Sequence, residues 1–329
     1  MIALDDPGTI GRHLQARGLM LDGNALTVRA LAGGVSAEVL AVSTPTRELV
    51  VKRALPRLRV QEEWRADVQR VVTEGRALRL AGELIPGAVP PVRDLDEHSH
   101  VLVMDRAPEA WTDWRDDLLA GRVDSSLGRV LGTLLAGWHV GTARALPLAE
   151  FADTSVFEQL RVDPFHRTVA ERHPDLSIHV EEVAARLLET KSCLVHGDFS
   201  PKNILVAPAR DEVWVLDWEV AHVGDPAFDL AFMLTHLVLK AVHRSTHAGK
   251  YRDTAEAFLD GYGAAAGAEG LRGSHRLAAQ VGCLLLARVD GKSPAGYLTP
   301  GERDRVRVLG RALLRAPSGD ILDAWRLPA

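Results

Sequence analysis

The sequence is poor in cysteine, with Cys193 and Cys283 as its only two among 329 residues. Two thiols so far apart neither form a disulfide framework nor supply the four ligands of a structural zinc site. Both are therefore expected to be reduced thiols packed in the interior.

The sequence also lacks an excess of positive charge and long apolar runs. The formal net charge is -5, which argues against a nucleic-acid partner. No apolar run reaches the ~18 residues of a membrane span, and the start MIALDDPGTIGRHL has no cationic segment followed by an apolar one. We expect a cytoplasmic protein that acts on a small molecule, without nucleic acid or membrane as partner. The sequence leaves open whether the protein forms a homodimer.

The chain has enough hydrophobic residues, 47%, to bury a large core, and its pattern changes along its length. From about 24 to 106, alternating segments such as AEVLAVST, RELVVKRAL and VLVMD predict strands. Between them, RVQEEWRADVQRVVTEGRALRL has the apolar spacing of one amphipathic helix. This part is expected to be a small antiparallel β lobe with one main helix.

Helices are predicted for most of the sequence beyond about 124, including an apolar helix in FDLAFMLTHLVLKAVHR that should cross the core. A β-rich island at 194–217 predicts two short strands around a turn near APARDE. With a linker near 106–112, the sequence predicts an α+β, bilobal, protein-kinase-like fold. Its lobes would be 1–106, which binds nucleotide, and 107–329, which carries the catalytic and acceptor-binding groups.

Polar residues interrupt this β-rich island in LVHGDFSPKNILV. His196, Asp198 and Asn203 have the register of a protein-kinase catalytic loop, in which Asp receives the hydroxyl proton and Asn holds a metal ion. Asp217, after the apolar run VWVL, is the metal-binding Asp that the same template requires. For Asp198 and Asn203 the competing interpretation is a structural turn.

Three neighbouring residues are less specific. Glu219 is either a second metal ligand or a surface carboxylate. Lys202 either offsets charge on the transferred phosphate or is solvated. His196 is expected to brace the loop from inside rather than carry a proton.

Gly33, Gly34 and Ser36 lie between two predicted strands, where small residues let backbone N–H groups approach phosphates. Lys52 follows within the strand pattern LVVKRAL, and a lysine there needs a partner unless it reaches solvent. Glu74 on the next helix is the expected partner, with Glu62 or Glu63 as alternatives.

HGDFSPKN followed by LDWEVAHVGDPAFDLA resembles the aminoglycoside phosphotransferase and choline kinase superfamily over roughly residues 30 to 310. The run VKRALPRLRV and the Asp-Trp-Glu order at 217–219 look most like methylthioribose kinases. The resemblance implies a kinase-like fold, ATP or GTP as phosphoryl donor, Mg²⁺, and phosphorylation of a hydroxyl group. It places Met104, Asp105 and Ala107 at a purine-binding hinge. It also implies that Asp229 braces the catalytic loop, whereas the competing interpretation is a charge at a helix N-terminus.

Acceptor contacts are expected from LLLARVDGKSPAGYL, in which Arg288, Asp290, Lys292 and Tyr297 cluster. A pocket for polycationic aminoglycosides should contain carboxylates, and this segment has more basic residues than acidic ones. We therefore expect a neutral or weakly anionic acceptor, with Arg288 as principal contact. Trp111 and Trp114 are either binding platforms or packed aromatics.

Other functions stay open at this stage. A pseudokinase-like module would bind nucleotide without transferring phosphate, and an antibiotic-resistance phosphotransferase would take an aminoglycoside. A metal-dependent hydrolase would need more histidine ligands than His222, which argues against it.

Overall fold

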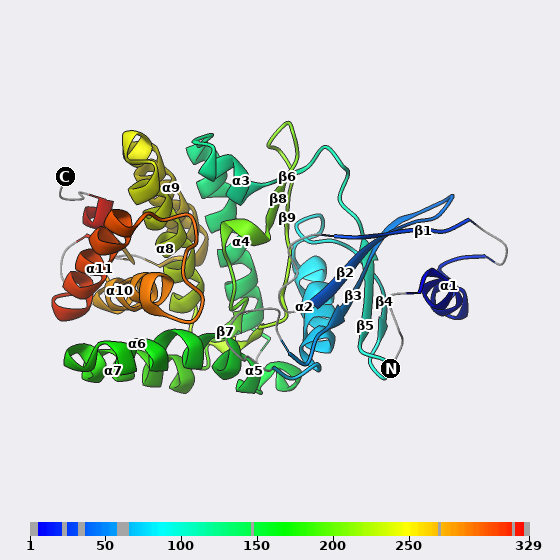
Figure 1. The fold of residues 1–329 in the computed structure, drawn as a ribbon, viewed down its shortest axis with the longest axis horizontal. Coiled ribbons are helices and arrows are strands. Elements are labelled where there is room, and N and C mark those ends of the chain that lie inside the picture. The colour runs from blue at the N-terminus through cyan, green and yellow to red at the C-terminus, as the bar shows by residue number, and fades with distance from the viewer. Residues whose placement is uncertain are drawn as a thin grey trace.

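The computed structural model describes residues 6–21, 25–31, 37–57, 66–145, 148–268, 271–317 and 320–325. The chain forms two lobes, with the N-terminal sheet on one side and most of the helices on the other (Figure 1). No helix in these ranges combines the length and the apolar character needed to cross a membrane.

The N-terminal lobe is a five-stranded antiparallel sheet with the order β1-β2-β3-β5-β4. Its elements are α1 (Pro7–Ala16), β1 (Thr27–Ala30), β2 (Ala37–Ser43), β3 (Glu48–Ala54), α2 (Arg70–Leu84), β4 (Val92–Asp96) and β5 (Val101–Asp105). The expected α+β class with an antiparallel sheet is confirmed.

The two faces of this sheet have different helical partners because side chains alternate along each strand. Val101 and Val103 share a core cluster with Ile10 of α1, whereas Leu102 belongs to the cluster that contains Leu78 of α2. Helices α1 and α2 accordingly lie on opposite sides of the sheet (Figure 1).

The helices of this lobe differ from the prediction in two respects. The predicted helix included residues from about 59, but α2 begins at Arg70, and residues 66–69 before it are not helical. Helix α1 was not predicted, although Asp6 supplies a strong start signal: its carboxylate accepts hydrogen bonds from the backbone of Gly8 and Thr9, and Pro7 occupies the first turn.

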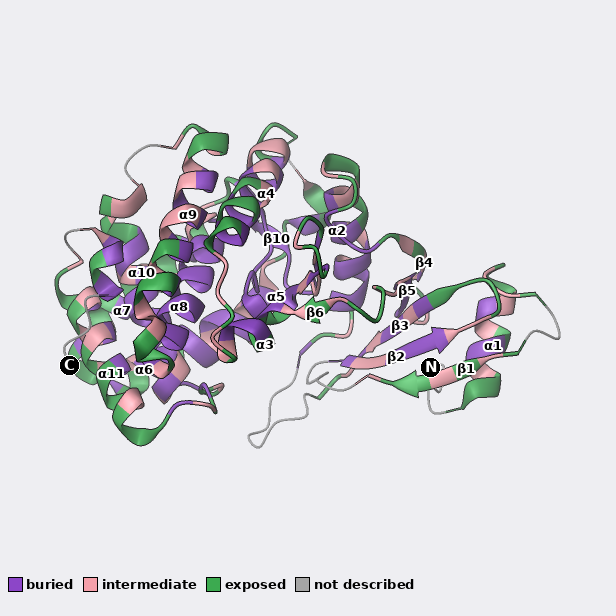
Figure 2. Cartoon of the chain, turned by 90° about the horizontal axis from the view of Figure 1, so that it is seen from above, coloured by how far each residue is buried: buried purple, intermediate pink, exposed green. Residues whose placement is uncertain are grey.

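The C-terminal lobe consists mainly of helices. They are α3 (Trp114–Leu119), α4 (Ser125–Ala143), α5 (Ser155–Phe157), the π-helix η2 (Glu158–Arg167), α6 (Thr168–Arg172), α7 (Ser177–Glu189), α8 (Ala227–His243), α9 (Ala248–Ala266), α10 (His275–Asp290) and α11 (Pro300–Arg315). Short 3₁₀ segments are η1 (Ala149–Phe151), η3 (Pro174–Leu176), η4 (Pro201–Asn203), η5 (Ser245–His247), η6 (Leu271–Gly273) and η7 (Ile321–Trp325). The apolar helix expected to cross the core is α8, which is buried from Phe228 to Val242 (Figure 2).

Short strands in the segments between these helices form two small sheets. Strand β7 (Cys193–Val195) pairs with β10 (His222–Gly224), and β6 (Thr112–Asp113), β8 (Ile204–Val206) and β9 (Val213–Val215) form the other sheet. The predicted hairpin is confirmed as β8 and β9, with Ile204 opposite Val215. The pairing of β10 with β7 was not predicted, because three residues are too few for a recognisable alternation.

Helices α4 and α9 approach each other closely at glycines. A Cβ added to Gly132 would lie 2.0 Å from the carbonyl oxygen of Phe258, and one added to Gly261 would lie 2.4 Å from that of Arg129. These positions therefore exclude any larger side chain unless the helices separate.

Candidate active site

The loop between β7 and β8, residues 196–203, is the predicted catalytic loop and is held in place by α8. The carboxylate of Asp229 accepts hydrogen bonds from the backbone N–H groups of His196, at 2.7 Å, and Gly197, at 2.9 Å. Gly197 has φ of +76°, and a Cβ there would lie 2.8 Å from the carbonyl oxygen of Val220. Glycine is therefore required at this position, and Asp229 orients the loop.

Asp198 lies in this loop with only 3% of its surface exposed, among three hydrogen-bond or ion-pair partners. Its Oδ2 lies 3.1 Å from Arg161 Nη2 and 2.8 Å from Lys202 Nζ. The amide of Asn203 donates to the same oxygen at 2.8 Å. Burial opposes ionisation, but the charges of Arg161 and Lys202 outweigh it and hold the pKa of Asp198 below its usual value. The carboxylate is thus ionised and held in one orientation.

His196 is fully buried and both ring nitrogens are engaged. Nδ1 accepts a hydrogen bond from the backbone N–H of Asp198 at 3.1 Å, so the proton resides on Nε2, which donates to Leu216 at 3.0 Å. Burial lowers the pKa of His196. A neutral histidine that connects the loop to the end of the hairpin has the geometry of a brace.

Asn203 and Asp217 come together through the β8–β9 hairpin. The backbone N–H of Leu216 donates to the carbonyl of Asn203 at 2.8 Å, which places Asp217 next to the catalytic loop. Asp217 has φ of +66°, an uncommon conformation that aspartate tolerates better than most residues.

Lys52 connects the two lobes. Its Nζ donates to Glu74 on α2 at 2.9 Å and to Asp217 at 2.6 Å, so the predicted Lys52–Glu74 ion pair is present. Burial alone would lower the pKa of Lys52, but the carboxylates of Asp217 and Glu74 raise it above its usual value. The lysine therefore remains protonated at the junction of sheet, helix and hairpin.

Glu219 makes a different contact from the one the sequence suggested. Its Oε2 accepts a hydrogen bond at 3.0 Å from Nε of Arg70, a completely buried side chain at the start of α2. The carboxylate thus joins α2 to the segment after β9. A role as metal ligand stays a prediction.

The predicted nucleotide-binding residues occupy separate places. Gly33, Gly34 and Ser36 lie outside the described residues, as do Glu62 and Glu63. Met104 is buried at the end of β5, and Asp105 pairs with Arg93. The backbone N–H of Asp105 donates to Pro91, whereas that of Ala107 has no partner among the described residues.

The four predicted acceptor residues do not converge. Asp290 pairs with Arg307, at 2.7 Å, and its Oδ2 lies 3.0 Å from Nε2 of His173. Lys292 is exposed. Arg288 and Tyr297, in contrast, lie close enough for the arginine charge to act on the pKa of the phenol. The four residues are close in sequence, but α10 ends at Asp290, so the side chains before and after this point take different directions.

Sequence reasoning missed Arg161, Arg70 and Lys240. Arg161 contacts Asp198 from the π-helix, and its Nε donates to the carbonyl of Gly197 at 2.7 Å. No local signal separates a buried arginine in QLRVDPFHR from an exposed one.

The two tryptophans considered as binding platforms both contact other residues. Trp114 is 1% exposed and packed in the core, and the ring centroid of Trp111 lies 5.3 Å from that of Trp214.

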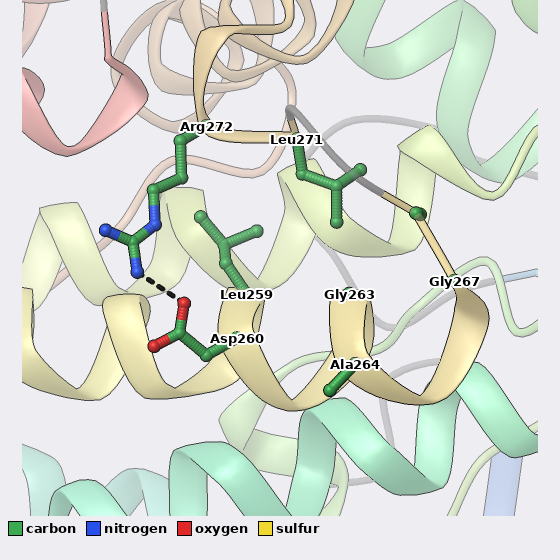
Figure 3. Close-up of a pocket in the computed structure, with 8 residues that line it drawn as sticks. Leu259, Asp260, Gly263, Ala264, Gly267, Leu271 and Arg272 are labelled. Atoms are coloured by element: carbon green, nitrogen blue, oxygen red, sulfur yellow. Dashed lines mark hydrogen bonds and ion pairs between the residues drawn. The ribbon is translucent and has the colours of Figure 1, made fainter.

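A hollow of about 520 Å³ lies at the C-terminal end of α9, between Gly263, Gly267 and Arg272 (Figure 3). Arg272 is already paired with Asp260 and Glu256. None of the predicted site residues lines this hollow.

Curated relatives are similar in sequence over part of the chain. A methylthioribose kinase of Bacillus cereus (strain G9842) is 27% identical over 231 residues, which are 60% of this chain and 56% of the relative. A methylthioribose kinase of Bacillus thuringiensis (strain Al Hakam) is 26% identical over 229 residues, again 60% and 56%. The matched region thus spans little more than half the length of these relatives.

Solved structures are similar in fold. The choline kinase LicA of Streptococcus pneumoniae has a TM-score of 0.52 at 15% identity, covering 94% of this chain and 98% of that one. The gentamicin complex of APH(2")-IIa has a TM-score of 0.51 at 16% identity, covering 98% and 99%. At such identities the likeness shows a kinase-like fold.

The model of the phosphotransferase enzyme family, APH, matches residues 27–279. This match includes the sheet, the catalytic loop, the hairpin, α8 and α9. The chain belongs to the phosphotransferase enzyme family.

Proposed function

We propose that this protein transfers the γ-phosphoryl group of ATP or GTP to a hydroxyl of a small molecule, acting in the cytoplasm. One observation carries the proposal: Asp198 accepts a hydrogen bond from Asn203, while Asp217, beside them, pairs with the Lys52 that Glu74 also holds. Phosphoryl transfer needs this combination of an oriented carboxylate and a metal-binding carboxylate next to a cation.

Asp198 acts on the acceptor. As the acceptor oxygen forms its bond to the γ-phosphorus, the bond from that phosphorus to the β-γ bridging oxygen breaks, and the hydroxyl proton passes to the carboxylate. Lys202 and Arg161 keep the carboxylate ionised before transfer. Lys202, 44% exposed in its side chain, can also offset charge on the transferred group.

Asn203 and Asp217 fit a Mg²⁺ ion. The Asn203 amide uses its nitrogen on Asp198, so its carbonyl oxygen, a hard ligand, is directed elsewhere. Two oxygen donors suit Mg²⁺, which takes few protein ligands and completes its shell with phosphates and water. The ion would neutralise charge on the triphosphate. Glu219 is the candidate further ligand, and it would have to give up its hydrogen bond with Arg70 to bind the ion.

The nucleotide is proposed to lie between the lobes. Lys52, held by Glu74, would contact its phosphates, and Gly33, Gly34 and Ser36 would approach them with backbone N–H groups. The segment containing Met104, Asp105 and Ala107 would contact the purine. The N–H of Ala107, which has no partner in the part of the chain that the structure describes, supports that role, and backbone groups of this kind can serve either purine.

The acceptor is proposed to be neutral or weakly anionic and sugar-like. Similarity to methylthioribose kinases supports a sugar. The basic side chains near Asp198 disfavour a polycation, and Arg288 is the proposed principal contact, with Tyr297 as a further candidate; Asp290, engaged by Arg307, and the exposed Lys292 are not proposed as contacts. A homodimer is compatible with this proposal.

The test is transfer itself. Purified protein is incubated with Mg-ATP or Mg-GTP and methylthioribose, neutral sugars, aminoglycosides or nucleoside antibiotics, and products are examined by mass spectrometry for an added phosphate. We expect phosphate on a neutral or weakly anionic acceptor. Tight nucleotide binding without ADP formation under any condition would instead identify a pseudokinase-like module.

A further inference from the structure

Lys240 is a buried cation that the proposed chemistry does not use. It lies on α8 and is 1% exposed. Among the described residues its Nζ has no hydrogen bond or ion pair; it lies 5.8 Å from the ring centroid of Tyr297. Burial, reinforced by the charge of Arg288, lowers the pKa of Lys240 to about 7. An unpaired lysine in the interior is costly, which points to a binding role.

Two neighbours of Lys240 also keep unused polar groups. Nε of Arg288 and the hydroxyl of Tyr297 are buried, and neither has a hydrogen-bond partner in the described ranges. Arg288 is held in place by Nη1, which donates to the Ser293 hydroxyl at 3.0 Å. Burial raises the pKa of Tyr297 to about 12, so its hydroxyl keeps its proton. Three donors are therefore available.

The surrounding groups do not neutralise this cluster. The nearby Asp113 pairs with Arg115 at 3.1 Å, and Asp198 is already held by Arg161 and Lys202. His236, one turn before Lys240, has a pKa well below its usual value because of burial and the surrounding cations, and is neutral. Lys240 and Arg288 thus lack an ion-pair partner among the described residues, and only the more distant charge of Asp113 favours the protonated lysine.

The cluster is close enough to the catalytic loop for the charges of the two to influence each other. Burial lowers the pKa of Arg288 and the charge of Asp198 opposes this shift, whereas the charges of Lys202 and Arg161 add to burial in lowering the pKa of His236. Helix α8 contains both Lys240 and Asp229, whose carboxylate binds the backbone of the catalytic loop. At about 1.5 Å per residue, the two are roughly 16 Å apart along the helix.

We propose that Lys240, Arg288 and the Tyr297 hydroxyl bind a carboxylate of the acceptor, which is a hydroxy acid whose hydroxyl reaches Asp198. This inference rests on the proposed function. A carboxylate has one charge and two acceptor oxygens, which match the donors of the cluster. A phosphate monoester, with nearly two charges, would require more donors.

The test compares acceptors that differ in one group. Hydroxy acids of four to seven carbons, including ribonate, gluconate, glucuronate and quinate, are each paired with the neutral alcohol or sugar and the amine analogue, and ribose 5-phosphate is added. ADP release and product mass are measured with Mg-ATP. We expect at least one acid to have kcat/KM at least a hundredfold above its neutral partner.

Substitutions then locate the effect. Lys240→Met should lower kcat/KM for that acid at least tenfold, mainly through KM, and should reduce the preference for the acid over its neutral partner by a similar factor. Tyr297→Phe should produce a smaller loss. Lys250→Met, which removes an exposed lysine of α9, is the matched control and should change neither.

The outcomes separate this inference from the proposed function. Slow ATP hydrolysis in the absence of an acceptor, if Asp198→Asn abolishes it, shows phosphoryl transfer independently of the carboxylate site. The proposed function fails if the protein neither hydrolyses ATP in this way nor phosphorylates any acceptor. The carboxylate site fails if transfer is equal or better with neutral, amine or phosphate analogues, or if Lys240→Met leaves the acid unaffected. It fails as well if no acid is phosphorylated and none raises the melting temperature of the wild-type protein.

Discussion

Arg161 holds both the side chain and the backbone of the catalytic loop: Nη2 lies 3.1 Å from Asp198 Oδ2, and Nε donates to the carbonyl of Gly197 at 2.7 Å. One buried arginine thereby fixes where the carboxylate lies and keeps it ionised. Lys202 contributes the second positive charge from within the loop.

Replacing Asp198 with alanine removes the proposed proton acceptor. We expect kcat to fall by about a thousandfold or more, while nucleotide affinity stays within a few-fold, because the lost interaction belongs to the transition state. Turnover and nucleotide titrations measure the two effects. A variant with near-normal kcat would contradict the assignment.

Replacing Asp217 with alanine should have a different signature. Since this carboxylate is the proposed Mg²⁺ ligand, Mg-ATP binding and rate should both fall, with affinity reduced at least tenfold. Calorimetric titration of Mg-ATP, compared with ATP in EDTA, isolates the metal-dependent part. Unchanged Mg-ATP affinity would exclude Asp217 as ligand.

Glu219 and Arg70 form a pair whose two members can be separated. Glu219→Gln and Arg70→Met should both destabilise the protein, by about 3 kcal/mol for loss of a buried partner. Only Glu219→Gln should raise the Mg²⁺ concentration for half-maximal activity, by about tenfold. Equal Mg²⁺ dependence in the two variants would leave Glu219 a purely structural role.

Lys240 should make stability depend on pH. Its pKa is about 7 in the folded protein against an ordinary value of 10.5, so its destabilising effect is complete below about pH 7 and disappears as pH rises toward 10.5. Besides burial, the positive charges of Arg288 and Arg115 lower the pKa of Lys240, and the negative charge of Asp113 raises it. Lys240→Met should thus be more stable than wild type near neutrality, and the difference should shrink with pH.

Urea unfolding at intervals from pH 6 to 10.5 measures that difference, with Lys250→Met as the exposed control. A difference independent of pH would mean that Lys240 is not destabilised by burial.

The sequence predicted the arrangement of the catalytic loop, hairpin and sheet because their signals are local. The spacing of His196, Asp198 and Asn203 lies within one loop. Lys52 and Glu74 were paired because a lysine in a strand needs a carboxylate, and the next helix offers one.

The missed residues depend on contacts distant in sequence. Arg161 and Lys240 look like ordinary basic residues of helices, and only the tertiary fold buries them. Asp290 and Lys292 were grouped with Arg288 by proximity along the chain, yet Asp290 pairs with Arg307 of α11. Sequence proximity at a helix end does not predict the direction of a side chain.

The glycine contacts between α4 and α9 bear on how the molecule opens. Residues 144–247, which include the catalytic loop and the hairpin, lie between these two helices in the sequence. Docking of the helices therefore joins the ends of a long chain segment, at a cost in conformational entropy. Because the backbones of the two helices approach each other closely at these glycines, we expect the helix pair and the loop to open as one cooperative unit. Native-state hydrogen exchange should give the amides of Gly132, Gly261 and Gly197 a common opening free energy, and Gly132→Ala should lower all three together.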